Sequence, residues 1–182
     1  GGMTWAEAGG GGTVLKVFTK MFGGGHSLSG TVNNGSATAV TGYVSPTITP
    51  QSSSSKFVIQ WTISGDNTDH HFFQLRRNIG GSITSVGLAK STIANSNQYN
   101  DWNSFFRHNA TNSYPQKTLT FFDAPATASN VFYQLYYEAH GGTFYFGRSS
   151  TNPSTNQYKS LNSLIIWELD GSNITNTDEP NY

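Results

Sequence analysis

The sequence contains no cysteine and few charged residues. The lack of cysteine in all 182 residues excludes a disulfide-stapled scaffold, thiol catalysis and cysteine-ligated zinc. Charged residues make up 11% of the chain, and ten Lys and Arg balance ten Asp and Glu. The chain therefore lacks the excess of positive charge that is typical of a nucleic-acid-binding protein. No apolar run approaches the roughly 20 residues that span a bilayer, and no signal peptide is recognisable. We expect neither nucleic-acid binding nor membrane insertion.

Hydroxyl and amide side chains take the place of charges. Ser, Thr, Asn and Gln together account for 67 of the 182 residues, and aromatic residues reach 14%. A disordered polar segment would not carry so many aromatic rings. The length fits one domain better than two. The composition therefore predicts one folded domain with an uncharged polar surface.

Alternating apolar and polar residues predict β-strands, and no segment shows the 3.6-residue period of a helix. The clearest alternation lies in 56–63, and similar patterns occur in 131–138 and 163–169. The strand at 14–22 places Leu15, Val17 and Met21 on one face and Lys16, Phe18 and Lys20 on the other. The residues expected to contribute to the core are Phe57, Ile59, Trp61, Val131, Tyr133, Leu135, Ile165 and Trp167.

Turn-forming residues separate these strands, among them Pro50 to Ser55, Ser64 to Asp69 and Asn78 to Ser82. The predicted fold is all-β, an antiparallel two-sheet β-sandwich of jelly-roll-like form with about eight strands. Residues 13–171 would form the sandwich, 1–12 a Gly-rich N-terminal arm or connector, and 172–182 a C-terminal tail. Because the chain does not begin with Met, we expect it to be part of a longer protein.

The sequence offers little to catalysis or metal binding. The run from Asp66 to His71 looks rich in ligands, but His70 and His71 would project to opposite faces of a strand. A turn with Asx caps explains these residues as well. No HExxH, GxSxG or phosphate-binding loop occurs, and the scattered acids form no recognisable glycosidase pair. We expect no catalytic residues, no metal and no cofactor.

A long segment from Ser91 to Ser113 carries aromatic rings next to amides. Tyr99, Asp101, Trp102 and Asn103 combine flat apolar surfaces with hydrogen-bonding groups, which suit the C–H faces and hydroxyls of sugars. The same residue types are also common where subunits pack against each other. Both interpretations stay open: a receptor or glycan site formed by these four residues, or a subunit contact.

Three short strings occur in an order and spacing that resemble a known domain. They are ITPQSSSSKFVI from Ile48, FFDAPAT from Phe121 and SLIIWEL from Ser163. Together they resemble a domain of bacteriophage tail-fibre and other virion structural proteins, many from aquatic phages, over roughly 14–171. The long 91–113 segment and the tail after Asp170 depart from that pattern. The resemblance implies a virion location and no catalytic residues.

The sequence thus predicts a non-enzymatic structural and adhesive module of a virion, such as a tail-fibre or appendage domain that functions in host attachment. Its expected partners are copies of itself in a homotrimer, other virion proteins and a host surface glycan. Oligomerisation would give a thin fibre its strength and let several weak binding faces act together. The alternatives are a free carbohydrate-binding module or lectin and, less favoured, a polysaccharide depolymerase, which would need a carboxylate pair.

Overall fold

The computed structural model describes residues 14–23, 27–29, 37–67, 71–86, 104–106, 116–139, 142–148 and 160–174. These residues form eleven β-strands and one turn of 3-10 helix, η1 (Gly171–Asn173), and they contain no α-helix. The strands are β1 (Val14–Phe22), β2 (Ser27–Ser29), β3 (Thr38–Val44), β4 (Lys56–Asn67), β5 (His71–Ile79), β6 (Ser82–Ser85), β7 (Ser104–Phe106), β8 (Gln116–Asp123), β9 (Val131–Ala139), β10 (Thr143–Phe146) and β11 (Asn162–Leu169).

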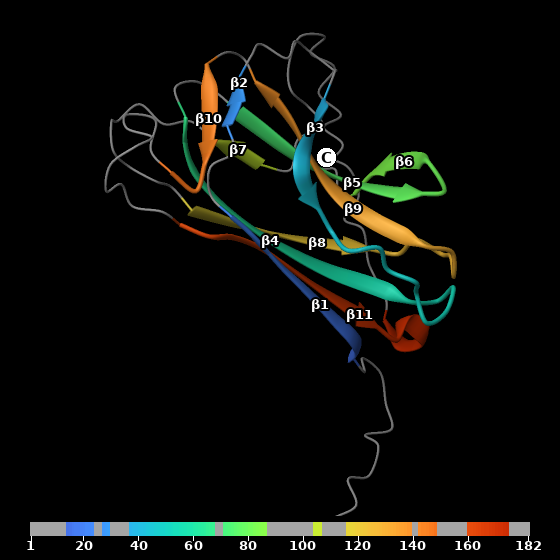
Figure 1. Cartoon of the computed structure of the whole chain (residues 1–182). Helices are drawn as coiled ribbons and strands as arrows, with labels where there is room; N and C mark the ends of the chain where they lie inside the picture. Colours follow the sequence, from blue (N-terminus) through green and yellow to red (C-terminus); the bar gives the residue numbers. More distant parts are fainter. Residues whose placement is uncertain are drawn as a thin grey trace, which may run out of the picture.

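The strands form two antiparallel sheets that lie as two layers (Figure 1). The first sheet has the order β1-β11-β4-β10-β2, with β8 also paired to β4. The second has the order β3-β9-β5-β6, with β7 also paired to β5. The predicted all-β, two-sheet antiparallel architecture is therefore confirmed. The strand number exceeds the expected eight because β2, β6, β7 and β10 have only three or four residues each.

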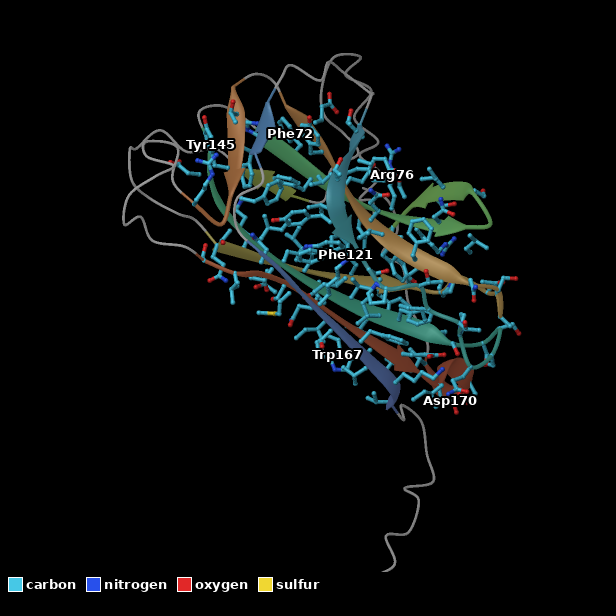
Figure 2. All side chains as sticks on the ribbon, viewed as in Figure 1. Phe72, Arg76, Phe121, Tyr145, Trp167 and Asp170 are labelled. Atoms are coloured by element: carbon cyan, nitrogen blue, oxygen red, sulfur yellow. The ribbon has the colours of Figure 1, made fainter. Side chains whose placement is uncertain are left out.

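Aromatic side chains from both sheets fill the space between the layers, and Phe121 is an example in Figure 2. Phe22 stacks on Tyr43 with ring centroids 4.6 Å apart, and on Trp61 at 5.4 Å. Offset ring stacking adds to the free energy gained by burying these large surfaces. Six of the predicted core residues are fully buried, as expected: Phe57, Ile59, Trp61, Val131, Tyr133 and Leu135.

The prediction was wrong for Ile165 and Trp167 on β11. Both are half-buried on the outer side of the sheet, whereas Leu164 and Ile166 point into the core. Figure 2 shows Trp167 on the side of its sheet that faces away from the other layer. The alternation could not distinguish the two faces, because β11 carries large apolar side chains on both. Glu168 shares the inward face with Leu164 and Ile166.

In two segments that were predicted as loops, some residues form strands instead. Strand β4 continues to Asn67, although Ser64 was expected to begin a turn, because residues 65–67 pair with β10. Gly65 permits this close pairing, since a Cβ there would lie 2.7 Å from the Phe144 ring. Strand β7 lies within the 91–113 segment that was expected to be loop, and it pairs with β5.

The predicted tight turn after β5 is confirmed. Gly80 and Gly81 both adopt positive φ, 57° and 93°, which non-glycine residues rarely adopt. This backbone matches the right-handed twist of a two-residue hairpin joining β5 to β6. Asn78 supports the turn, because its Oδ1 accepts a hydrogen bond from the Gly81 amide at 2.9 Å.

Candidate functional site

The first sheet presents an apolar surface on its outer side. A row of four side chains crosses four adjacent strands, one from each strand: Val17, Trp167, Val58 and Phe122. Each member is the direct cross-strand partner of the next, so the row is continuous. Side chains two or four residues further along the same strands share this side, since side chains alternate between faces. We call this surface the apolar outer face; it consists of Val17, Met21, Val58, Phe122, Ile165, Trp167 and Leu169.

Exposure of large apolar side chains is concentrated on and beside β1; within the apolar outer face Val17 and Met21 are exposed and the other members are half-buried. Six such side chains are exposed among the described residues, and four of them lie on β1. Val17 is 53% exposed and Met21 59%, and Leu161, just before β11, is 57% exposed. Single exposed apolar residues are ordinary, but a contiguous group marks an interaction surface. Of the six, Ile83 alone lies on the other sheet, on β6.

The opposite side of β1 carries its two lysines and closes the side of the sandwich. Lys20 Nζ donates a hydrogen bond of 2.7 Å to the carbonyl oxygen of Val44 on β3, in the other sheet. The same ammonium lies 5.2 Å from the centre of the Phe22 ring. Lys16 occupies the equivalent side of β1 and is also half-buried. The apolar residues of β1 face outward because the side facing the sandwich is occupied by these lysines with Phe18 and Phe22.

Hydroxyls and amides complete the outer side of this sheet. Next to the apolar row lies the cross-strand row Thr19, Ile165, Gln60 and Thr120, followed by Met21, Ser163, Thr62 and Thr118. The Thr62 and Thr118 hydroxyls are 3.0 Å apart and hydrogen-bonded. Among the outward-facing described residues of β1, β11, β8 and the part of β4 paired with β11 (56–62), Lys56 is the one charged side chain. Its ammonium donates a hydrogen bond to the carbonyl of Ile174, beside η1.

The outer side of the second sheet has a different chemistry. The Arg76 guanidinium lies over the ring of Tyr136 at 4.4 Å, and its Nε donates a 2.6 Å hydrogen bond to Gln74 Oε1. The register places Gln134 directly opposite Arg76, and Asn78 opposite Phe132. The two outer sides therefore differ: one is apolar and almost uncharged, and the other combines rings, amides, a cation and the buried side chain of Glu138.

A buried polar contact joins the two sheets at one end of the core. Asp123 ends β8, and its Oδ1 accepts a 2.6 Å hydrogen bond from the Arg77 guanidinium on β5. Its Oδ2 accepts a 2.8 Å hydrogen bond from the Tyr133 hydroxyl on β9. Burial raises the pKa of Tyr133 above its ordinary value, and the neighbouring Asp123 carboxylate raises it further. The phenol is thereby kept as a donor, and this contact serves the stability of the fold.

A second buried carboxylate holds the connection between β3 and β4. Glu168 is fully buried, and its Oε1 accepts hydrogen bonds from the Gln51 amide at 2.5 Å and the Ser55 hydroxyl at 2.8 Å. Both donors lie in the segment that the sequence predicted as a turn. The burial of Glu168 is therefore explained by its structural role, which is to hold the segment between β3 and β4.

The predicted receptor residues Tyr99, Asp101, Trp102 and Asn103 lie outside the described residues, as do the predicted arm at 1–12 and most of the predicted tail. Sequence reasoning missed the surface that the structure brings together. The alternation of Val17 and Met21 on β1 and of Ile165 and Trp167 on β11 placed these residues on one side of each strand, but it did not show that this side faces outward.

The described part of the chain shows no group of three or more His, Asp or Glu side chains placed to hold a metal ion. It also contains no helix with the length and apolar character needed to cross a membrane. Neither the protein-family models nor the curated proteins contain a match to this sequence.

Proposed function

We propose that the chain is a non-enzymatic structural and adhesive module of a bacteriophage particle, such as a fibre or appendage domain, and that it works as a homo-oligomer, in its expected form a trimer. The observation that carries the proposal is the apolar outer face, a contiguous and partly exposed surface on a β-sandwich otherwise rich in hydroxyls and amides. Its other expected partners are neighbouring virion proteins and a host surface glycan.

The low charge of the chain supports a role in an extracellular particle. Contacts between charged groups weaken when salt screens them, whereas apolar contacts do not depend on ion pairing. A module held by the apolar outer face would therefore stay attached over a wide range of ionic strength. This property suits a particle that meets water of variable salinity.

Density-gradient sedimentation of particles that carry the chain tests the proposal. The chain should sediment with the particles, stay bound through a wash at about 1 M salt, where screening of charges is nearly complete, and be decorated by antibody on their surface. Recovery of the chain from the soluble fraction alone, with undecorated particles, would contradict a virion role.

Host attachment is proposed to use Tyr99, Asp101, Trp102 and Asn103. Rings stacked on sugar faces and amides paired with hydroxyls give weak single sites, which several copies strengthen through avidity. Trp102→Ala should strongly reduce binding of the oligomer to cells or glycans while its mass and melting temperature stay nearly unchanged. If the variant loses its oligomeric state or unfolds, Trp102 belongs to a subunit contact or the core instead.

A second candidate is a free carbohydrate-binding module, favoured by the outer side of the second sheet. There the Tyr136 ring lies under Arg76, and the amides of Gln134 and Asn78 are close by. Rings, amides and a guanidinium together can bind an acidic sugar. Glycan binding by a monomeric chain, abolished by Tyr136→Ala, would favour this candidate over the virion module.

A further inference from the structure

We propose that the apolar outer face packs against a neighbouring copy of this chain, an inference that rests on the homo-oligomeric module proposed above. The row Val17, Trp167, Val58 and Phe122 forms the centre of this contact, Ile165 and Met21 extend it along β11 and β1, and the threonines of the neighbouring rows form its rim. Each protomer contributes the surface as the fold leaves it, with the apolar side chains already placed outward. No rearrangement of the sheet is needed.

The structure favours contact through the face over strand pairing at the β1 edge. Strand β1 is an edge strand of its sheet, and an exposed edge can pair with a strand of another copy. Charged side chains turned inward on an edge strand are a common protection against such pairing. Lys16 and Lys20 have this orientation, and Lys20 is tied to the Val44 carbonyl of the other sheet. The edge is therefore protected, while the apolar face next to it is left open.

The chemistry of the face suits a second copy of the same chain. A charged surface needs an opposite charge on its partner, and two identical charged surfaces repel each other. This face has Lys56 as its single outward charge, at the end of the sheet, and the chain has a formal net charge of zero. Hydroxyls and amides donate and accept hydrogen bonds, so Thr19, Gln60 and Thr120 can pair with the same residue types on another copy.

A specific contact through this face would have to use most of its area. Four strands about 4.8 Å apart and about 27 Å long present roughly 500 Å² in projection, before side-chain relief is added. Specific interfaces bury at least about 600 Å² per partner. Contact at β1 alone would fall well below this area, whereas contact across β1, β11, β4 and β8 comes close to it. The apolar row spans those four strands.

Single-cysteine variants test the contact directly, since the natural chain contains no thiol. Met21→Cys places a thiol on the face, and Ile83→Cys places a matched thiol on the other sheet, at 59% and 49% exposure of the natural side chains. Labelling of Met21→Cys by a maleimide should slow about tenfold once nine-tenths of the protein is assembled, because only dissociated copies expose the thiol. Labelling of Ile83→Cys should not depend on protein concentration.

Light scattering gives the second measurement. Met21→Glu should reduce the mass from a multiple of 19.8 kDa to the protomer, while Ile83→Glu should leave the multimer intact. A multimer that survives Met21→Glu and labels rapidly at Met21→Cys would overturn this inference and leave the proposed homo-oligomer standing. A monomer that labels rapidly would overturn both.

A monomer in which Met21→Cys is protected at every concentration would also overturn the inference. In that case a segment of the same chain covers the face. Deletion of residues 1–13 would identify the N-terminal segment as that cover if it restored rapid labelling.

Discussion

Val17 on β1 lies directly across from Trp167 on β11, and both side chains point away from the core of the sandwich. The pair is the start of an apolar row that continues through Val58 to Phe122. Directly opposite residues on one face of an antiparallel pair are the closest side-chain neighbours in a sheet. The pair therefore forms a compact apolar unit on the surface of the protomer, and it is the basis of the assembly proposed here.

The core should depend strongly on Trp61. This side chain is fully buried and stacks on Phe22 at 5.4 Å. Trp61→Ala should lower the free energy of unfolding by about 3–5 kcal/mol, through lost burial and the cavity left behind. Urea unfolding of the purified chain measures this loss. Ile83→Ala, at an exposed position of β6, is the control and should change stability by no more than about 0.5 kcal/mol.

The contact between Asp123, Arg77 and Tyr133 should be a stability determinant that a double-mutant cycle can measure. Asp123→Ala leaves the largely buried Arg77 cation and the buried Tyr133 hydroxyl without this acceptor, which should cost about 3 kcal/mol. Tyr133→Phe should cost about 1–2 kcal/mol in the natural chain, and much less when Asp123 is already Ala. Equal costs of Tyr133→Phe in both backgrounds would show that the two side chains do not interact.

Stability should fall in alkaline solution through Tyr133. Burial, with Asp123 beside it, raises the pKa of Tyr133 in the folded chain above its ordinary value of 10.0. Above that value the unfolded chain releases the phenol proton while the folded chain keeps it, so unfolding is favoured as pH rises. The contribution is fully present below pH 10.0 and declines by at most about 1.4 kcal/mol per pH unit above it.

Unfolding free energies at about pH 9 and about pH 11 check this expectation. Tyr133→Phe should lose less stability between the two values than the natural chain does, because one titrating group has been removed. Tyr43 contributes in the same direction, since burial raises its pKa as well. An unchanged pH dependence in Tyr133→Phe would contradict the assignment.

Gly171 at the start of η1 should not tolerate a side chain. A Cβ at this position would collide with the backbone carbonyl of Ser54 and lie 2.9 Å from Lys56 Cγ. Gly171→Ala should therefore displace η1 from β4 and lower stability by about 1–3 kcal/mol, as overpacking does in cores. Gly23→Ala is a matched control, because nothing lies within 4 Å of a Cβ there. Thermal unfolding of both variants measures the difference.

The all-β fold could be predicted from the sequence because its signals are local. Alternation in 56–63 and 131–138 identified two central strands, and Phe57, Ile59 and Trp61 are buried as expected. The glycines of the predicted Asn78 to Ser82 turn adopt positive φ and set the hairpin after β5. Each of these features depends on a few neighbouring residues and on the period of two that a strand imposes.

The candidate surface could not be predicted in this way. Strand β11 has Leu164 and Ile166 on one side and Ile165 and Trp167 on the other, so alternation alone leaves the buried side undecided. The decision depends on partners distant in sequence, because Asn162 Oδ1 accepts a hydrogen bond from the Ser64 amide and Glu168 Oε1 accepts one from the Ser55 hydroxyl. A buried carboxylate or amide is tolerated only where such partners exist. The sequence by itself determined which residues alternate, and the tertiary structure decided which side faces outward, because only the packed fold supplies the hydrogen bonds that polar groups need inside.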